Sequence, residues 1–275
     1  MFEILFFPMD EIFFRIFLGM IQGITEWLPV SSSGIITIIN SNLSGTINIS
    51  TLLHFALFLH LGTFFAALIY FRKEVTELVI SLFRYSSSDI KTKNTLKFLI
   101  ISTVISGILG LLILKTLLSF ESYLAITGKT ITLFIALFLI ITGITQLSVR
   151  TSGLKKEKNL KLKDGIILGF AQGLASLPGI SRSGITVSTL LLKKFDDTTA
   201  LRLSFLMSLP IVLIGNIFLN MNDFVFSSSL LYGLIASFVF GILTIHGLMK
   251  LSRRINFGWF ALIFGLLTLV SLVIL

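Results

Sequence analysis

Apolar residues along this chain are grouped into long stretches that are separated by shorter polar ones. Six such stretches lie at residues 52–71, 98–118, 131–147, 203–219, 230–249 and 257–275. Each is about as long as a helix must be to cross the roughly 30 Å of hydrocarbon in a bilayer. Backbone groups in lipid must find their partners within the segment, and a helix provides them. We therefore predict six transmembrane helices.

Two further apolar segments, residues 12–39 and 166–192, are broken in the middle by proline, serine and glycine. The breaks read Pro-Val-Ser-Ser-Ser-Gly at residues 29–34 and Pro-Gly-Ile-Ser-Arg-Ser-Gly at residues 178–184. Non-helical backbone survives at membrane depth only where protein or a water-filled cavity satisfies it. We predict that each segment is a re-entrant helix hairpin, which enters the membrane, turns at the break and returns.

The two broken segments also resemble each other in sequence. At a constant offset of 150 residues, seven of the seventeen positions from 19 to 35 are identical, and the shared residues include Gln, Gly and Ser rather than only Leu and Ile. Two unrelated Ser/Gly turns are the simpler alternative. We favour an internal repeat because matches of this polar kind are uncommon in membrane sequence.

The repeat divides one integrated membrane domain into residues 1–150 and 151–275, each a hairpin plus three spans. Three crossings are an odd number, so the second half must be inverted relative to the first. The predicted fold is an all-α membrane protein with two inverted-topology repeats. Proteins of this architecture commonly bind their substrate near the midplane, where the repeats meet.

The composition agrees with a membrane protein and narrows the chemistry. Only 13% of the 275 residues are charged, against roughly a quarter in soluble domains. The chain has no cysteine, which excludes disulfides, thiolate chemistry and sulfur-ligated metals. In a membrane protein, the net charge of +9 reflects topology and contact with anionic headgroups, so we expect no nucleic-acid partner.

Basic residues collect in the four loops that this layout places on one side of the membrane. These loops hold 18 of the 22 Lys and Arg residues, at positions 72–97, 150–163, 193–202 and 250–254. Because Lys and Arg accumulate in cytoplasmic loops, we predict that these four loops are cytoplasmic. The chain then lies in the cell (plasma) membrane as a multi-pass protein with both termini outside.

Glu26 precedes the first break and Arg182 lies inside the second. An ionisable group within a membrane segment is costly and is normally retained for function, with a partner. Gln22 lies four residues before Glu26, on the same face of a helix. Two simpler interpretations stay open: Glu26 is an interfacial carboxylate in water next to Trp27, or Arg182 forms a salt bridge with Glu26 and binds no ligand.

Serine and glycine residues lie beside the start of the second helix of each hairpin. Donors at a helix N-terminus can bind an anion, and serines also cap helices routinely. Ser32 differs from its neighbours because its counterpart in the repeat is Arg182. For the two glutamines, the alternative is a hydrogen bond that joins the hairpins. The candidate substrate-binding residues are Gln22, Ser31, Ser33, Gly34, Gln172, Ser181, Ser183 and Gly184.

Ser32, Glu26 and Arg182 are the candidate catalytic residues. A hydroxyl that attacks, a carboxylate that takes a proton or holds a divalent ion, and an arginine that stabilises charge together suit phosphoryl transfer. They suit equally the binding of an anionic headgroup without cleavage.

Three histidines, His54, His60 and His246, lie on predicted spans, and none is spaced to form a metal site with a nearby carboxylate. We expect packing or interhelical hydrogen bonds from them. His60 is the strongest candidate for an exception, because Gly62 and Thr63 indicate a close helix contact.

The residues around both breaks resemble the undecaprenyl-diphosphate phosphatase family, also called bacitracin-resistance proteins. Residues 22–34 look like the family's (Glu/Gln)-x-x-x-Glu segment and serine turn, and residues 178–184 look like its Pro-Gly-x-Ser-Arg-Ser-Gly motif. Weaker similarity runs through residues 60–63, 204–210 and 252–257. The resemblance covers nearly the whole chain.

This resemblance implies an often dimeric membrane enzyme with two re-entrant hairpins and six spans. Such an enzyme removes the terminal phosphate of a polyprenyl diphosphate lipid with help from a divalent cation, Mg²⁺ or Ca²⁺. By position, Glu26 matches the essential second acid and the candidate metal ligand, and Ser32 matches the proposed nucleophile. Ser33 matches a hydroxyl position, and Arg182 matches the phosphate-binding arginine.

Two residues depart from the family pattern. Gln22 replaces a carboxylate found in many members, which weakens a two-carboxylate metal site. Ile35 stands where the family usually has a histidine, to which some mechanisms give a base or nucleophile role. A translocase or binding protein for a polyprenyl phosphate is therefore the rival hypothesis, because inverted repeats and broken helices are also transporter architecture. A purely structural scaffold would leave Glu26 and Arg182 unexplained.

Overall fold

The computed structural model describes residues 11–28, 30–36, 39, 49–121, 128–147, 153–177, 179–220 and 228–251, together with scattered positions between 259 and 270. Within these residues the regular structure is helical, and β-type pairing is limited to an isolated bridge between Lys155 and Phe195. The predicted all-α fold class is confirmed at this level. The two termini, whose orientation was predicted, lie outside the described residues.

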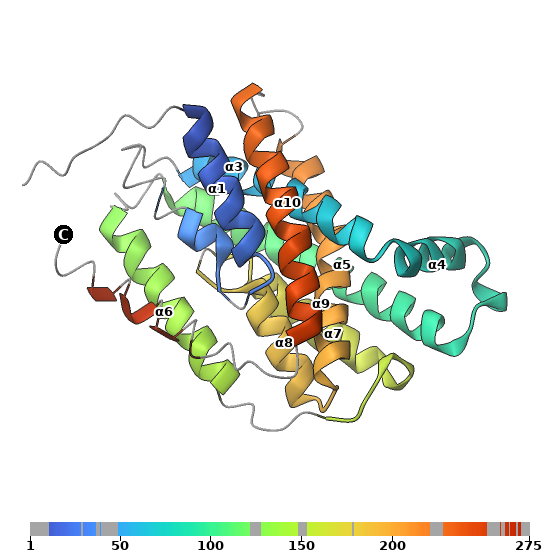
Figure 1. Cartoon of the computed structure of the whole chain (residues 1–275). Coiled ribbons are helices and arrows are strands. Elements are labelled where there is room, and N and C mark those ends of the chain that lie inside the picture. The colour runs from blue at the N-terminus through green and yellow to red at the C-terminus, as the bar shows by residue number, and fades with distance from the viewer. Residues whose placement is uncertain are drawn as a thin grey trace, which may run out of the picture.

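The helices form one bundle, and helix α4 (Arg72–Phe83) extends away from it (Figure 1). A short helical segment at residues 32–36 follows the first break. The elements are α1 (Glu11–Thr25), α3 (Ile49–Tyr70), α4 (Arg72–Phe83), η1 (Tyr85–Ser87), α5 (Ile90–Glu121), α6 (Gly128–Leu147), η2 (Glu157–Asn159), α7 (Leu162–Leu174), α8 (Arg182–Leu192), α9 (Asp197–Asn220) and α10 (Ser228–Leu251).

Among the described residues, three helices are long and apolar enough to cross a membrane, at Ile90–Thr116, Asp197–Phe218 and Ser228–Lys250. A fourth span is possible by length and composition if α3 and α4, which are bent by 86° at their junction, are counted as one. These match four of the six predicted spans. The apolar part of α6, Ala136–Thr145, covers the third predicted span but is shorter. Most of the sixth, residues 257–275, lies outside the described residues.

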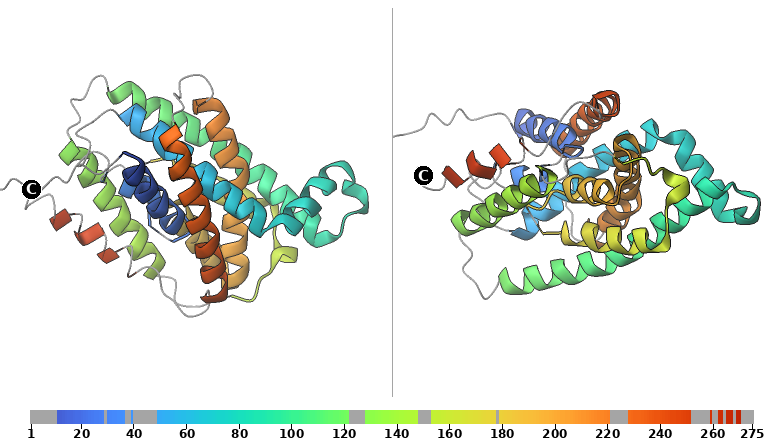
Figure 2. Two further views of the ribbon diagram at one scale, coloured as in Figure 1. Left: turned by 45° about the horizontal axis from the view of Figure 1, so that its top comes forward. Right: turned by 90° about the horizontal axis from the view of Figure 1, so that it is seen from below.

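The loop predicted at residues 72–97 is largely helical. It contains α4, the turn η1 and the first residues of α5, which begins at Ile90 rather than near residue 98. In the views of Figures 1 and 2, α4 and the start of α5 extend together beyond the rest of the bundle. Hydropathy could not indicate these helices, because their exposed faces carry the charged residues that mark a loop.

Both broken segments are helix–break–helix units, as predicted. The first helix ends at Thr25, residues 26–28 form a turn, and helix resumes at residue 32. The second unit consists of α7, a break, and α8 beginning at Arg182. Each second helix starts with the same cap: the Gly34 N–H donates to Ser31 Oγ at 3.2 Å, and the Gly184 N–H donates to Ser181 Oγ at 3.0 Å.

Glycines bring each first hairpin helix very close to a long helix. On α1, a Cβ at Gly19 would overlap the carbonyl oxygen of Gly233 in α10, and a Cβ at Gly23 would lie 2.7 Å from the Ser237 carbonyl oxygen. On α7, a Cβ at Gly169 would lie 2.7 Å from the Ile105 side chain in α5. Small residues at such positions allow helix backbones to approach in membrane proteins, so these contacts hold the hairpins in the bundle.

Candidate active site

The two breaks meet in the middle of the bundle. The Gly179 N–H donates to Ser31 Oγ at 3.1 Å, and Ser183 Oγ donates to the Leu28 carbonyl oxygen at 2.6 Å. All of these groups are at or next to a point where a helix is interrupted, so backbone that has left one helix finds partners in the other hairpin. The side chains predicted as the site are therefore brought together by residues about 150 positions apart in sequence.

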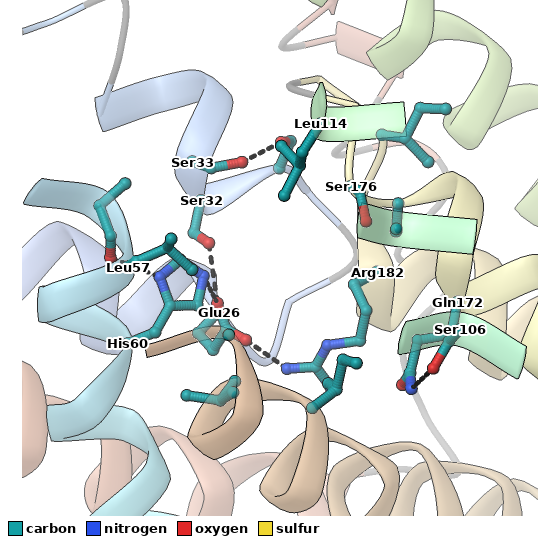
Figure 3. A pocket seen from close by; sticks show the side chains of 18 of the residues that line it. Glu26, Ser32, Ser33, Leu57, His60, Ser106, Leu114, Gln172, Ser176 and Arg182 are labelled. Atoms are coloured by element: carbon teal, nitrogen blue, oxygen red, sulfur yellow. Dashed lines mark hydrogen bonds and ion pairs between the residues drawn. The ribbon is translucent and has the colours of Figure 1, made fainter. Parts of the chain in front are cut away.

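Glu26 lies at the centre of this arrangement and is 6% exposed. Its Oε2 accepts from Gln22 Nε2 at 3.0 Å and from Ser32 Oγ at 2.8 Å, and it lies 3.1 Å from His60 Nε2. Its Oε1 accepts from Arg182 Nη2 (Figure 3). The alternative of an interfacial carboxylate in water is wrong, because protein donors surround this group.

Arg182 is the first residue of α8 and joins the two halves of the site. Its Nη2 pairs with Glu26, and its Nη1 donates to the Ser204 carbonyl oxygen in α9 at 3.2 Å. The guanidinium also lies 5.8 Å from the ring centroid of Trp27, whose side chain is buried. The predicted alternative of an ion pair with Glu26 is thus present in the structure, and it places the cation where an incoming anion would meet it.

His60 is the residue of the site that the sequence did not identify as chemical. It lies on α3, with Nε2 facing Glu26 and Nδ1 2.5 Å from the carbonyl oxygen of Ala56. Both ring nitrogens face acceptors, but a neutral imidazole has only one N–H. A neutral His60 can therefore donate to only one of these two acceptors, whereas a protonated His60 donates to both.

The other two histidines agree with a packing role. His246 on α10 lies against Tyr70, with ring centroids 6.2 Å apart, and neither it nor His54 lines the pocket described below. The useful signal for His60 was its position just before Gly62, where a Cβ would lie 2.5 Å from the Leu234 carbonyl oxygen. That close contact fixes α3 beside α10.

The serines have two different roles. Ser31 and Ser181 are helix caps, as one of the two predicted interpretations held, and each lies near the serine two residues later, with Oγ–Oγ distances of 3.3 and 3.2 Å to Ser33 and Ser183. The N–H groups of Gly34 and Gly184 are occupied by these caps. Ser32 instead directs its hydroxyl to Glu26.

The two glutamines do not join the hairpins to each other, so that alternative is wrong. Gln22 donates to Glu26, whereas Gln172 donates from Nε2 to Ser106 Oγ in α5 at 3.0 Å. The Oε1 atoms of Gln22 and Gln172 are both buried without a hydrogen-bond partner. Buried acceptors of this kind are uncommon and call for a ligand, an ion or water.

Ile35 does not face the site. It is buried with Val30 and Leu139, and it is absent from the pocket wall. A histidine in this place would have to enter an apolar cluster or displace the segment. The chain therefore carries its only pocket-lining imidazole among the described residues on α3 instead.

A pocket of about 180 Å³ opens beside these groups. One end is polar and contains Glu26, Ser32, Ser33, His60 and Arg182, and the Gln172–Ser106 pair lies on the opposite wall (Figure 3). The rest of the wall is mostly aliphatic and is provided by α3, α5 and α9.

The donor set for a metal ion is small. The described residues contain no cluster of three or more His, Cys, Asp or Glu side chains that would enclose one. Glu26 lines the pocket, and Gln22, whose Nε2 donates to Glu26, has its Oε1 buried without a hydrogen-bond partner; both are oxygen donors of the kind that Mg²⁺ and Ca²⁺ prefer. They fit a cation that takes its other ligands from phosphate oxygens and water.

The geometry of Ser32, Glu26 and His60 is that of an activated nucleophile. A serine hydroxyl donates directly to a carboxylate, and that carboxylate is oriented by further donors, which is the arrangement that nucleophilic catalysis needs. With Glu26 ionised, Arg182 balances its charge, and protonation of His60 makes the site net positive. Such a site suits a phosphate group.

Comparison with known proteins agrees with this chemistry. A sequence profile described as bacitracin resistance protein BacA matches residues 15–270. A protein named undecaprenyl-diphosphatase from Methanococcoides burtonii is 38% identical over 94% of this chain and 97% of its own length. Proteins with the same name from Haloarcula marismortui and Borrelia recurrentis are 35% and 32% identical, each over 96% of this chain and 98% of their own length.

Proposed function

The chain belongs to the bacitracin resistance protein BacA family, and from this membership we propose that it is a membrane phosphatase acting on a polyprenyl diphosphate of the undecaprenyl type. It releases the terminal phosphate and leaves the polyprenyl monophosphate, the form of a lipid carrier. The relatives that match nearly the whole chain are named undecaprenyl-diphosphatase.

One observation supports catalysis more than binding alone: Ser32 Oγ donates to Glu26 Oε2 at 2.8 Å. A translocase needs no hydroxyl aimed at a buried carboxylate. In the proposed reaction, Ser32 Oγ attacks the terminal phosphorus while its proton passes to Glu26. The bond between that phosphorus and the bridging oxygen breaks, and the polyprenyl monophosphate departs. Water then attacks the phosphoserine, which restores Ser32 and releases inorganic phosphate.

Arg182 and His60 have the supporting roles. Arg182 gives up part of its contact with Glu26 to the substrate and stabilises the negative charge on the phosphate oxygens in the transition state. When His60 is protonated, its proton is available to the oxygen of the leaving monophosphate. Their proximity to Ser32 in the pocket supports both assignments.

A divalent cation, Mg²⁺ or Ca²⁺, is part of this proposal. Gln22 Oε1 and Glu26 would hold the cation. The Gln22 oxygen is suitable because it is buried without a hydrogen-bond partner. When bound, the ion would neutralise charge on the substrate's phosphates. Because the chain provides few ligands, we propose that the ion binds together with the diphosphate rather than before it.

We also propose that the two helix–break–helix units are re-entrant hairpins of two inverted repeats, comprising residues 1–150 and 151–275. The packing of α1 and α7 supports this. By the repeat, α7 corresponds to α1 and α10 corresponds to α5. The first hairpin helix of each half packs through glycines on the long helix of the other half, α1 on α10 and α7 on α5. Exchange of equivalent partners is what a pseudo-twofold axis produces.

The proposed location is the plasma membrane, with the loops around α4 and η2 on the cytoplasmic side and both termini outside. The membrane-capable helices and the family support a membrane enzyme in general, and the loop charges support the orientation. A homodimer, which the family resemblance implies, stays a prediction.

The function is tested with purified full-length protein and farnesyl or undecaprenyl diphosphate, with and without Mg²⁺ or Ca²⁺. We expect cation-dependent release of inorganic phosphate and, with substrate labelled in the terminal phosphate, transient label on the protein. Ser32→Ala should lower the turnover rate at least 10³-fold and abolish the labelling. Ser208→Ala is the matched control, because Ser208 is a buried serine outside the pocket whose Oγ donates to the Phe205 carbonyl oxygen, and it should retain most of the activity.

Two outcomes would contradict parts of this account. Wild-type protein that binds the lipid but releases no phosphate under any cation condition would exclude the phosphatase and leave the translocase. Undiminished turnover by the Ser32→Ala protein would leave the function in place and show that another nucleophile, such as water, attacks.

A further inference from the structure

The pocket continues beyond the charged residues into an apolar space between α3, α5 and α9. We call this space the corridor and define it by the lining residues Leu57, Gly107, Leu111, Leu114, Ile211 and Gly215. Leu57 and Leu114 face the same space as Glu26 and Arg182 (Figure 3). The corridor and the polar site therefore form one continuous pocket.

Two glycines of the corridor have room for a side chain. A Cβ on Gly107 would have one neighbouring atom within 4 Å, the Cδ1 of Ile211 at 3.8 Å. A Cβ on Gly215 would likewise have one, the Cδ2 of Leu57 at 3.7 Å. Both distances are ordinary van der Waals contacts, so the described neighbours would accept alanine at either position.

Several other helical glycines of this protein are required by helix packing. A Cβ at Gly23 would lie 2.7 Å from the Ser237 carbonyl oxygen, and one at Gly62 would lie 2.5 Å from the Leu234 carbonyl oxygen. Glycine is unfavourable inside a helix and is normally kept there for a close contact. Gly107 and Gly215 have no such contact, and unlike Gly247, which has none either, both of them line the pocket.

The contact between α9 and α3 does not depend on Gly215. It is made by the next residue, Asn216, whose Nδ2 donates to the Leu57 carbonyl oxygen at 2.9 Å. The two helices are therefore held together beside the corridor, and Gly215 leaves the space next to that hydrogen bond empty.

We propose that the corridor receives the isoprenoid units next to the diphosphate, and that Gly107 and Gly215 keep it wide enough for them. This rests on the proposed function, because the occupant is the chain of that substrate. With the terminal phosphate at Ser32 and Arg182, the chain must leave the polar site through the part of the pocket that is apolar. The branched methyl groups of isoprenoid units need more width than a straight acyl chain, which the two bare helix surfaces provide.

The test compares wild type with Gly107→Leu, Gly215→Leu and the control Gly247→Leu. Gly247 lies on α10 outside the pocket, and a Cβ there would meet nothing within 4 Å. For each purified protein, kcat and KM are measured with farnesyl and undecaprenyl diphosphate. The rise in unfolding temperature caused by farnesyl monophosphate, and by inorganic pyrophosphate as a probe without a chain, is also measured.

We expect both corridor substitutions to lower kcat/KM for the two lipids at least tenfold, mainly through KM, and to remove the stabilisation by farnesyl monophosphate. Stabilisation by pyrophosphate should persist, because the polar site is unchanged. Gly247→Leu should match wild type within twofold. Folded corridor variants with wild-type kcat/KM would overturn the proposal while leaving the phosphatase intact.

The binding measurement separates this proposal from the function itself. Suppose that wild type releases no phosphate, and that farnesyl monophosphate stabilises wild type but not the Gly215→Leu protein. The corridor proposal would then be supported and the phosphatase proposal contradicted. If the leucine variants do not fold, the double variant Gly107→Ala/Gly215→Ala decides, since both new methyl groups fit the described neighbours. It should unfold no earlier than wild type and show at least threefold lower kcat/KM for undecaprenyl diphosphate, and an unchanged kcat/KM would overturn the proposal.

Discussion

Glu26 shows how a buried carboxylate can be kept available for chemistry. Its oxygens receive Gln22, Ser32 and Arg182 as donors and face the imidazole of His60. Burial of an unpaired carboxylate would be prohibitive, so this full set of partners is what allows the group to remain at the pocket. The same partners orient Glu26 so that it accepts from the Ser32 hydroxyl.

His60→Gln tests whether the imidazole supplies a proton or only orients Glu26. Glutamine can still donate a hydrogen bond to the carboxylate, but unlike an imidazole it cannot be protonated and pass that proton on. We expect turnover to fall about 10²-fold, within the range typical of general acid–base groups. We also expect the alkaline limb of the kcat–pH profile to disappear, because that limb reports the loss of the proton from His60. The pH dependence of phosphate release measures both effects.

Full activity of the His60→Gln protein, with an unchanged pH profile, would show that His60 acts only by positioning Glu26. His246→Gln is the matched control, because His246 lies on α10 against Tyr70 and outside the pocket. It should leave kcat and its pH profile unchanged.

Gln22→Glu tests the proposed cation site. A second carboxylate beside Glu26 adds a hard oxygen ligand and a negative charge, both of which favour a divalent ion. We expect the Mg²⁺ or Ca²⁺ concentration for half-maximal phosphate release to fall several-fold, and activity without added cation to decrease. A cation dependence identical to that of wild type would place the ion away from residue 22.

At the scale of elements, the glycines of the hairpin helices determine where the site forms. Gly19 and Gly23 allow α1 to pack on α10, and Gly169 and Gly173 allow α7 to pack on α5. These contacts bring the ends of α1 and α7 to the same depth in the bundle, where the breaks exchange hydrogen bonds. The polarity of the breaks predicted their importance, but the backbone approach decides that they meet.

Gly19→Ala should destabilise the protein, because the new methyl group would overlap the backbone of Gly233. Overpacking of this kind typically costs about 1–3 kcal/mol, and we expect a lower thermal unfolding midpoint in detergent. Gly247→Ala is the control, since its methyl group would meet nothing within 4 Å, and it should be at least as stable as wild type. A Gly19→Ala protein of wild-type stability would show that α1 and α10 can separate at no cost.

Element prediction from sequence succeeded where one property dominated a long stretch. The hydropathy of α5, α9 and α10 predicted spanning helices, and the proline and serine residues predicted both breaks. The sequence prediction missed α4 because charged and apolar residues are mixed along that helix. The mean hydropathy of such a segment is low, as it is in a loop. The hydropathy of the segment did not indicate the 86° bend between α3 and α4, where Phe71 at the junction is buried among core residues.

At the scale of the whole molecule, the predicted orientation in the membrane can be measured directly, because the chain has no native cysteine. Ser87 and Ser228 are both exposed, in η1 and at the start of α10. We expect a membrane-impermeant maleimide to label Ser228→Cys in intact cells, and Ser87→Cys only after permeabilisation. Labelling of Ser87→Cys alone in intact cells would show that the orientation is the reverse of the proposed one. Labelling of both variants in intact cells would contradict the proposed topology.

From the amino-acid sequence alone we could predict an all-α membrane protein, the places of its two breaks, and Glu26 and Arg182 as candidate site residues. These follow from local properties: hydrocarbon length, backbone hydrogen bonding, and the cost of placing a charge in a membrane segment. Tertiary structure alone decided that His60 faces Glu26, that Ile35 turns away from the pocket, and that Gly107 and Gly215 border an open corridor. Each of these depends on what another helix places opposite the residue, and no pattern along one segment records that.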